Sequence, residues 1–287
     1  HKELSETDYI VLNSNGGKLT ADFAWNSTRP TDSHFSIGAG ATQVNGNGEE
    51  YVAYLFADNP EGGIKCGSYD GNSSSDGPTV SCGFKPGWVL IKASNTDNVS
   101  EAQTSWMIID NARGTSKSLY PNAAGQENTF GSPPAYLEFT DDGFKLTDNA
   151  DLTNKSGATY IFVAIAEGLD KNPAELTFAD STNFDLFQVG DTVGEPAAFS
   201  TTLWSGNNVT GRVITTGIDN TGKSLIWTKA TNINNQSHLL YDSERGDFGE
   251  ALQANDTSKQ LPYAGIQNVS STGFSTFAEY TTNKSGT

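Results

Sequence analysis

The chain has 287 residues, enough for two or three small domains that each bury a core of their own. Charged residues make up only 18% of it, and Asn, Ser, Thr and Gly carry most of the polarity, a composition that favours strands joined by many turns. A net charge of −17 with only 17 Lys and Arg residues argues against a nucleic-acid partner, because phosphate binding needs clustered cations. The longest apolar run, residues 160–166, is far shorter than the ~20 residues that span a bilayer, so we expect no membrane insertion.

Residues 1–58 are predicted to be the C-terminal part of a first β-sandwich unit. The sequence KLTADFAW at 18–25 alternates apolar and polar residues, which is the pattern of a half-buried strand. The sequence YVAYLF at 51–56 is apolar at nearly every position, which predicts a central strand covered on both faces. Residues 58–63, DNPEGG, have the composition of a linker.

Residues 59–170 are predicted to form a second β-sandwich unit. The sequences IKCGSY at 64–69 and TVSCGF at 79–84 flank a Gly- and Ser-rich loop, and we interpret them as a hairpin. Further strands are expected at 88–94, 105–111, 136–139, around Gly143-Phe144, and at 159–166. The strand at 136–139 is expected to pair with the Gly-Phe strand that follows it.

Residues 171–198 are predicted to be an acidic, Pro-containing connector, and 199–287 a third β-sandwich unit that is truncated at its last strand. Strands of this third unit are expected at 200–206, 212–218, 224–230 and 237–243. No stretch of the chain shows the sustained 3.6-residue apolar period of a helix. The sequence therefore predicts an all-β fold of tandem two-sheet antiparallel sandwiches with little or no helix.

The units share a repeated sequence, most completely at 141–166, where a Gly-Phe strand precedes an Asn- and Asp-rich turn region and then an apolar strand. Related sequences occur at 32–57 and 271–287, and a repeat of this kind indicates tandem modules. Matching positions lie 132 residues apart for Asp110 and Asp242 and for Arg113 and Arg245, 130 apart for Phe144 and Phe274, and 109 apart for Tyr51 and Tyr160. We interpret the repeat as the closing β-hairpin of each module. Its last copy stops before the apolar strand, so we expect either that the natural chain continues or that another strand covers an open sheet edge.

The most specific constellation is a D-x-x-R-G sequence that occurs once in each of the last two units. Its two copies are Asp110, Arg113 and Gly114, and Asp242, Arg245 and Gly246. An Asp three residues before an Arg at a strand end can pair with it across a tight turn, with Gly supplying a positive φ. We favour a structural turn lock over ligand contact, because both copies lie within otherwise similar sequences.

Two tryptophans are weak candidates for ligand contact. Trp25 and Trp204 lie next to Asn-, Ser- and Gly-rich loops, where an indole ring could stack on a sugar. Trp88, Trp106 and Trp227 lie within apolar strands, so core packing is the preferred role for them.

No catalytic, cofactor-binding or metal-binding residues are predicted. The three histidines lie far apart in the sequence, which contains no zinc-ligand spacing, nucleophile motif or phosphate-binding loop. Oxygen-rich loops such as 147–154 leave Ca2+ binding as an alternative, although none has the spacing of an EF-hand. Cys66 and Cys82 could face each other across a hairpin, bridged or not, and free buried thiols are the preferred reading.

The sequences that match a known family are WNSTRPTDSHFSIGAGATQVNGNGEEYVAYLFADNPEGG, IKCGSYDG, GFKPGWVLIKAS, WMIIDNARG, FTDDGFKL, NKSGATYIFVAIAE, SLIWTKA and SHLLYDSERG. Over 8–167 and 199–287 the units resemble concanavalin A-like β-sandwich modules that are repeated along tail-fibre and other virion-surface proteins of tailed bacteriophages, notably marine cyanophages. The resemblance implies a jelly-roll-like two-sheet sandwich, a structural or receptor-binding role and no catalysis. It transfers no binding residues to this chain.

The first expectation for function is therefore a virion structural protein, a segment of a phage tail fibre or similar appendage that recognises a host-surface glycan or protein. By analogy we expect other virion proteins and copies of the chain itself as partners, in a homotrimer, and a location on the virion surface or outside the cell. The alternatives are a stand-alone lectin or bacterial surface adhesin and, third, a carbohydrate-active hydrolase, which would need two carboxylates facing a groove. The sequence leaves open the receptor, the oligomeric state, and what precedes residue 1 or follows residue 287.

Overall fold

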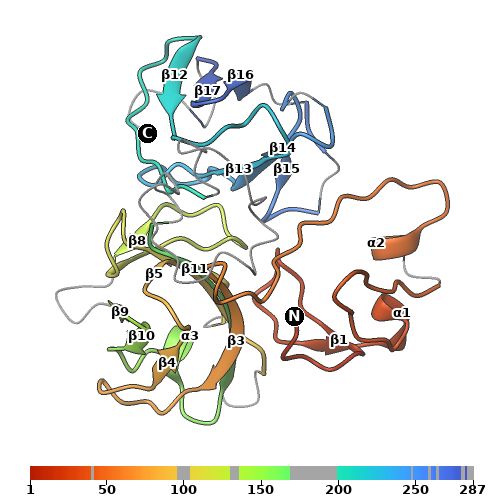
Figure 1. The fold of residues 1–287 in the computed structure, drawn as a ribbon, viewed down its shortest axis with the longest axis vertical. Coiled ribbons are helices and arrows are strands. Elements are labelled where there is room, and N and C mark those ends of the chain that lie inside the picture. Colours follow the sequence, from red (N-terminus) through yellow and green to blue (C-terminus); the bar gives the residue numbers. More distant parts are fainter. Residues whose placement is uncertain are drawn as a thin grey trace.

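Antiparallel β-sheets dominate the computed structural model of the chain (Figure 1). The structure describes residues 1–39, 42–95, 104–129, 136–168, 199–246, 248–257, 260–262, 265–278 and 282. Its three helices are single turns of four residues, and its sheets pair antiparallel, which confirms the all-β prediction. No helix in this described part of the chain is long and apolar enough to cross a membrane. The predicted connector at 171–198 lies outside the described residues.

The described residues of 64–166 form the central sandwich, which contains two sheets. The larger sheet has the order β3-β11-β5-β6, with β3 at Ile64–Asp70, β11 at Thr159–Ala166, β5 at Pro86–Ala93 and β6 at Met107–Asp110. The smaller sheet has the order β4-β10-β9, with β4 at Thr79–Ser81, β10 at Gly143–Leu146 and β9 at Leu137–Thr140. A ribbon of β7 (Lys117–Ser118) with β8 (Asn128–Thr129) and a helical turn, α3 (Asp151–Asn154), complete the central sandwich.

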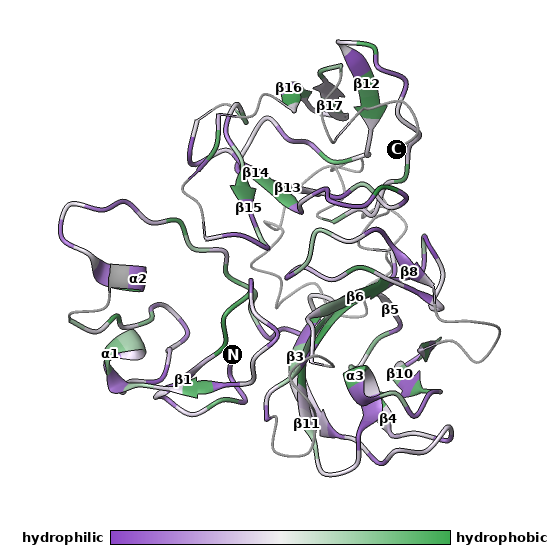
Figure 2. Cartoon of the chain, turned by 180° about the vertical axis from the view of Figure 1, so that it is seen from behind, coloured by the Kyte–Doolittle hydropathy of each residue, from purple (hydrophilic) through white to green (hydrophobic). Residues whose placement is uncertain are grey.

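Strand β11 lies at the centre of the larger sheet, as its apolar sequence predicted. It pairs along one edge with β3 and along the other with β5. Tyr160, Phe162 and Ala164 are buried in the core between the two sheets, whereas Val163 and Ile165 belong to a second apolar cluster on the outer face. From the smaller sheet, Phe144 meets the ring of Phe162 edge-on at 5.2 Å. Strands β5 and β6 are hydrophobic, whereas β8 is hydrophilic (Figure 2).

The C-terminal sandwich, formed by the described residues of 199–282, repeats this plan with shorter strands. One sheet has the order β12-β17-β16, with β12 at Arg212–Thr215, β17 at Gly273–Thr276 and β16 at Ile266–Ser270. The other has the order β13-β14-β15, with β13 at Leu225–Thr228, β14 at Leu239–Asp242 and β15 at Leu252–Gln253. Its core includes Ile214, Ile226, Tyr241, Ile266 and Phe274.

The strands of the two sandwiches correspond pair by pair. In the β5–β6 pair, Trp88 lies opposite Asp110. In the β13–β14 pair, Leu225 lies opposite Asp242 at the equivalent place. The smaller sheet β4-β10-β9 is matched in the same way by β12-β17-β16. No described strand of the C-terminal sandwich takes the places that β3 and β11 hold in the central one.

The N-terminal region, residues 1–58, contains less β-structure than the sequence predicts. It holds a two-residue ribbon of β1 (Asp8–Tyr9) with β2 (Leu19–Thr20), and the helical turns α1 (Asp22–Trp25) and α2 (Thr42–Asn45). The strand predicted at 18–25 is therefore wrong beyond residue 20, and the strand predicted at 51–56 is wrong throughout. An apolar segment becomes a strand only where neighbouring strands pair with its edges and cover its faces, and a two-stranded ribbon is marginal by itself.

Two predicted hairpins are also wrong. The segments at 64–69 and 79–84 do not pair, because β3 belongs to the larger sheet and β4 to the smaller one. The repeat at 141–166 is not a closing hairpin either, since β10 and β11 lie in opposite sheets. The connection from β3 to β4 and the connection from β10 to β11 each lead from one sheet to the opposite sheet. The predicted pairs β5–β6 and β9–β10 are confirmed.

The two sandwiches pack against each other through an apolar cluster on the outer face of the larger sheet. Trp88, Ile108, Leu119 and Ile165 form its buried part, and Phe199 and Trp227 of the C-terminal sandwich pack against it. The rings of Trp88 and Phe199 are 6.0 Å apart. Burial on both faces explains why β5 and β11 are apolar at nearly every position.

The glycine of each Gly-Phe strand lies against the backbone of a neighbouring strand. A Cβ atom on Gly143 would overlap the carbonyl oxygen of Val80, and one on Gly273 would overlap that of Ile214. The copy in the N-terminal region has His34 at the matching position, 109 residues before Gly143. Glycine is therefore required where the β4 or β12 strand is present beside the repeat.

We expect Gly143→Ala to lower the free energy of unfolding by about 3 kcal/mol, because the added methyl group forces β4 and β10 apart. Gly125→Ala is the matched control, since a Cβ there meets nothing within 4 Å. Urea denaturation of both variants measures the difference. Equal stability of the two variants would contradict the close approach.

Asp148 is a buried carboxyl in the loop before α3. It is 2% exposed and accepts a hydrogen bond from Thr153 Oγ1 at 2.7 Å. Burial raises the pKa of this carboxyl to about 6. The folded protein therefore holds this proton more tightly than the unfolded chain, whose pKa is ~3.9. The resulting stabilisation is fully present below the unfolded pKa and is lost as pH rises through about 6.

We expect the Asp148→Asn variant to gain about 2 to 3 kcal/mol of stability relative to the unmodified chain as the pH rises from 4 to 8, because the amide carries no titrating proton. Urea unfolding across this range measures the gain. Asp141→Asn, which changes an exposed carboxylate, serves as the control. A stability difference between Asp148→Asn and the unmodified chain that stays constant with pH would refute the expectation.

Candidate functional site

The D-x-x-R-G turn after β6 is held by its own side chains. The carboxylate of Asp110 accepts a hydrogen bond from the backbone N–H of Arg113 at 2.9 Å and one from its Nε at 2.7 Å. The Arg113 guanidinium also donates to the backbone oxygen of Ile108 and lies 3.3 Å from Glu127. Gly114 follows with φ of 92°, in the left-handed region that favours glycine.

The turn after β14 repeats this geometry. Asp242 accepts from the backbone N–H of Arg245 at 3.0 Å and from its Nε at 2.6 Å, and Gly246 has φ of 104°. Asp242 also accepts a hydrogen bond from the Tyr54 hydroxyl at 2.5 Å. Burial disfavours the Asp242 carboxylate, but the hydrogen bonds from Tyr54 and Arg245 outweigh it and lower its pKa. Both arginines thus pair with the aspartate of their own turn, and Arg113 also pairs with Glu127.

A cavity of about 470 Å³, which we call the inter-sandwich hollow, lies beside the first of these turns. Ala112, Arg113, Lys117 and Glu127 line it from the central sandwich, and residues 202–205, 229–231 and 282 line it from the C-terminal one. Glu127 lies 3.1 Å from Lys117 Nζ and thereby joins the Arg113 ion pair into one network. Paired charged side chains therefore line the hollow on the side of the central sandwich, and mostly uncharged residues line it on the side of the C-terminal sandwich.

The residues that line the hollow can make polar contacts with a ligand. Glu127 is the single carboxylate among the described lining residues, so the two acids of glycoside hydrolysis are not placed together there. Burial lowers the pKa of the Lys229 amine to about 8, and this amine donates to the Ala230 oxygen at 2.6 Å.

The two predicted ligand-contact tryptophans lie in different parts of the fold. Trp25 donates from its indole N–H to the backbone oxygen of Asp8 at 3.1 Å, and its ring meets Phe35 edge-on. Trp204 lines the inter-sandwich hollow, and its indole N–H donates to the Thr282 oxygen at 2.7 Å. Both rings are half-buried, so each has an anchoring role in the chain itself.

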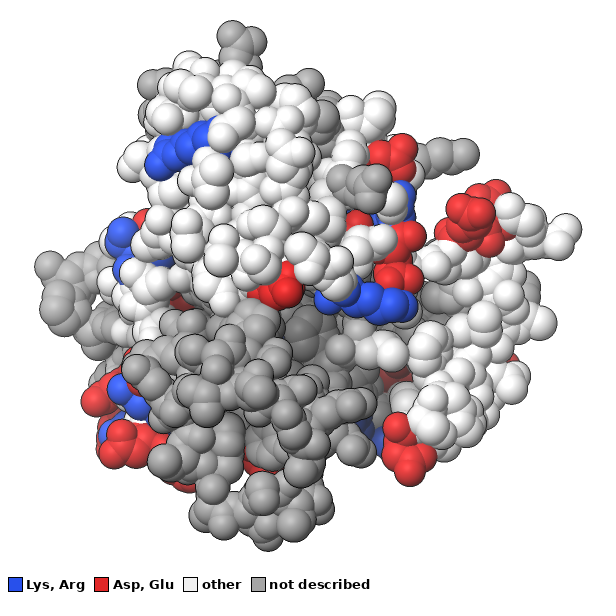
Figure 3. Space-filling model, turned by 45° about the horizontal axis from the view of Figure 1, so that its top comes forward, with Lys and Arg blue, Asp and Glu red and all other residues white. Residues whose placement is uncertain are grey.

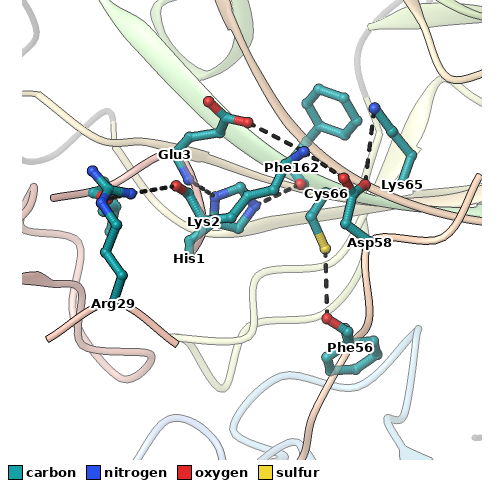
Figure 4. A network of polar contacts seen from close by, with 10 residues as sticks. His1, Lys2, Glu3, Arg29, Phe56, Asp58, Lys65, Cys66 and Phe162 are labelled. Atoms are coloured by element: carbon teal, nitrogen blue, oxygen red, sulfur yellow. Dashed lines mark hydrogen bonds and ion pairs between the residues drawn. The ribbon is translucent and has the colours of Figure 1, made fainter. Parts of the chain in front are cut away.

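A second polar cluster ties the first residues of the chain to the edge of the larger sheet (Figure 4). His1 donates from Nε2 to the backbone oxygen of Phe162 at 2.9 Å. Lys2 pairs with Asp58, whose carboxylate also lies 3.9 Å from Lys65 Nζ. A cavity of about 360 Å³ lies beside Lys2 and Lys65. These charges satisfy one another, so the cluster fastens the N-terminal region to β3.

The two cysteines are free thiols, one on each side of the core. Cys66 lies in β3 of the larger sheet, and Cys82 directly follows β4 of the smaller one. The prediction that they could face each other across a hairpin is wrong, whereas the preference for free, buried thiols is confirmed. Burial raises the pKa of Cys66 to about 11 and that of Cys82 to about 12, so both are protonated at neutral pH.

The loop at 147–154, an alternative site for Ca2+, uses several of its oxygens internally. Asp148 accepts from Thr153 through its side chain and from Asn154 through its backbone oxygen, each at 2.7 Å. Within the described ranges, no group of three or more His, Cys, Asp or Glu side chains could hold a metal ion.

A family model described as a domain of unknown function, DUF7483, matches residues 1–168, which is more than half of the chain. The chain belongs to the DUF7483 family. The match spans the N-terminal region and the central sandwich, and therefore includes the first Asp–Arg turn. No curated protein matches the chain, and no solved structure does.

Sequence reasoning missed that two equivalent lysines of this DUF7483 chain are withdrawn from solvent, Lys92 fully and Lys229 in part. Lys92 on β5 and Lys229 after β13 lie 137 positions apart, at the end of matching apolar sequences. Lys92 is fully buried and donates to the backbone oxygens of Asn15 and Thr104, and burial lowers the pKa of its amine to about 8. A lysine at the end of an apolar run, at the same place in both units, was the signal that could have found them.

We expect Arg113→Met to lower the free energy of unfolding by about 3 to 5 kcal/mol, because Asp110, 3% exposed, loses the cation that compensates its charge. Arg29→Met is the matched control, since Arg29 is 59% exposed and its ion pair with Glu6 should contribute less than about 1 kcal/mol. Chemical denaturation of both variants tests this. If Arg113→Met were as stable as the control, the turn would not be a structural lock.

Proposed function

We propose that this chain is a structural, tandem-repeat segment of a phage tail fibre or similar virion appendage, with a role in recognising the host surface. The observation that carries the proposal is the packing of two sandwiches with one strand plan through the cluster of Trp88, Trp227 and Phe199. Repeated units that bury an apolar face against their neighbours produce long, stiff arrays. Such arrays are what an appendage requires.

The phage and tail-fibre part of the proposal is supported by the resemblance of the repeated sequences to virion-surface modules. The recognition part is supported by the surface. Uncharged residues dominate the described part of the face in Figure 3, in line with a chain that is only 18% charged. Neutral sugars are bound by such polar, weakly charged surfaces through hydrogen bonds and aromatic stacking. In this role the partners are other virion proteins, copies of the chain, and an envelope glycan.

The test has two independent arms. A fluorescently labelled sample of the chain is applied to an array of bacterial envelope polysaccharides, with periodate-oxidised copies of each as controls. Binding to at least one polysaccharide, lost on oxidation, is the expected result, and binding to none would remove the recognition role. Electron microscopy of the longer protein that contains these repeats is expected to show sandwiches stacked along a rod, and a globular particle would overturn the appendage role.

A further inference from the structure

We propose that the C-terminal sandwich accepts a strand from a second copy of the chain. The strand is formed by residues 51–57 of the donor, and it inserts in the acceptor between residues 199–205 and β13. The inference does not depend on the virion role, because it follows from the strand plan of the two sandwiches.

The first argument is the place that β11 holds in the central sandwich. There, β11 lies between β3 and β5 and pairs with both along its length. In the C-terminal sandwich β13 is the counterpart of β5. Residues 199–205 are the counterpart of β3 but form no strand.

Ring contacts establish that second correspondence. Tyr69 of β3 meets Phe144 edge-on at 5.9 Å with an interplanar angle of 79°. Trp204 meets Phe274 at the same 5.9 Å with an angle of 78°. Phe144 and Phe274 are matching positions of the repeat. The segment around Trp204 is therefore positioned as β3 is, although it joins no sheet.

The inter-sandwich hollow lies at the end of β13, beside the place that the intervening strand would take. Residues 202–205 line it from one side, and Lys229 and Ala230, just after β13, line it from another. Within the described part of the chain, β13 pairs with β14 and with no other strand. Leu203, on the wall of the hollow, is 55% exposed. Within the described residues no strand joins these two segments, whereas in the central sandwich β11 lies between their counterparts.

The second argument is that residues 51–57 carry the sequence of β11. YVAYLFA at 51–57 aligns with YIFVAIA at 160–166 at an offset of 109. The turns that precede the two segments obey the same offset, since α2 spans Thr42–Asn45 and α3 spans Asp151–Asn154. The Tyr51 hydroxyl accepts from the backbone N–H of Gly46 at 2.7 Å, just as the Tyr160 hydroxyl accepts from that of Lys155 at 2.9 Å.

The third argument is exposure. Residues 51–57 run as coil from α2 towards β3 (Figure 1). Leu55 is 76% exposed and Phe56 43%, whereas the matching Ala164 and Ile165 of β11 are 0% and 4% exposed. Apolar residues at this density favour burial, and an apolar strand with open edges is a template for pairing with another chain.

The geometry points to residues 51–57 of a second copy rather than to the same residues of the same chain. Residues 51–57 lead into β3 and are anchored there, because the Cys66 N–H donates to Asp58 at 2.9 Å. The hollow lies by Arg113 and Lys117, which follow β6, at the opposite edge of the larger sheet. Tyr54 of the same chain meets the C-terminal sandwich at Asp242 on β14. Asp242 lies opposite Leu225 at the start of β13, whereas the hollow lies by Lys229 and Ala230, beyond its other end.

The offsets fix the register of the inserted strand. In the central sandwich Phe162 lies opposite Ile91, and Ala164 lies opposite Val89. At the offset of 109, Phe162 and Ala164 match Ala53 and Leu55, and at the offset of 137, Ile91 and Val89 match Thr228 and Ile226. The inserted strand therefore has Ala53 opposite Thr228 and Leu55 opposite Ile226. Leu55 would then close the core that contains Ile226.

The contact joins two different surfaces of the chain, so it is heterologous. Each copy would donate one strand and accept another, and repetition closes a ring or continues as a filament. Either assembly would be held by backbone hydrogen bonds on both edges of the donated strand, as in other cases of strand addition.

Cross-linking between single-cysteine variants tests the contact and its register. Ala53→Cys and Thr228→Cys proteins are purified separately, mixed and mildly oxidised, and a two-chain band on non-reducing gels is expected from the mixture but from neither protein alone. Mixing Val52→Cys with Thr228→Cys is the register control, because alternate side chains of a strand point to opposite faces. The native cysteines are buried, and the unmodified chain reports their background.

Sedimentation provides a second readout that needs no added cysteine. The unmodified chain is expected to form multiples of its 30.5 kDa mass as concentration rises, and Leu55→Asp to remain a single chain. Val213→Asp is the matched control, since Val213 is 65% exposed and outside the proposed contact. A single-chain mass for the unmodified protein at every concentration, without the cross-link, would overturn the proposal. A double variant that carries both Ala53→Cys and Thr228→Cys is the last control. A cross-link that forms within one chain of this double variant, with none between the mixed single variants, would overturn the proposal in favour of the chain's own segment.

Discussion

The central sandwich depends on β11, a strand that is paired along both edges and buried on both faces. Its inner side chains, Tyr160 and Phe162, fill the core against Phe144, while Ile165 belongs to the contact with the C-terminal sandwich. Pairing on both edges satisfies the backbone polar groups, and this satisfaction allows so apolar a segment to be buried. One strand therefore links the stability of the sandwich to the way in which sandwiches stack.

Among the described residues, the N-terminal region and the C-terminal sandwich have no counterpart of β11 that is paired along both edges. In the N-terminal region the β11-like segment at 51–57 is present, but the strands that would flank it are not among the described residues, and it is coil. In the C-terminal sandwich no described strand lies between β13 and the segment at 199–205, and a cavity of about 470 Å³ lies by residues 202–205 and 229–231. The two deficits are complementary, and the proposed exchange of a strand between copies would account for both.

The side-chain sites that repeat along the chain serve architecture. In the Asp–Arg turns the arginine pairs with the aspartate of its own turn, and the half-buried tryptophans Trp25 and Trp204 donate hydrogen bonds to backbone oxygens. Membership of the DUF7483 family covers the N-terminal region and the central sandwich.

The sequence by itself determined the all-β class, the pairs β5–β6 and β9–β10, and the Asp–Arg turns, because these depend on residues that lie close together in the chain. It did not determine which sheet each strand joins, so the segments at 64–69 and 79–84 were paired wrongly. Nor could it locate the inter-sandwich hollow, whose walls around Arg113, Trp204 and Lys229 come from three distant segments. Only the tertiary structure decided that β11 is a strand and residues 51–57 are coil, although the two sequences are alike. The physical reason is that a strand's hydrogen bonds and buried faces are supplied by neighbours far away in the sequence.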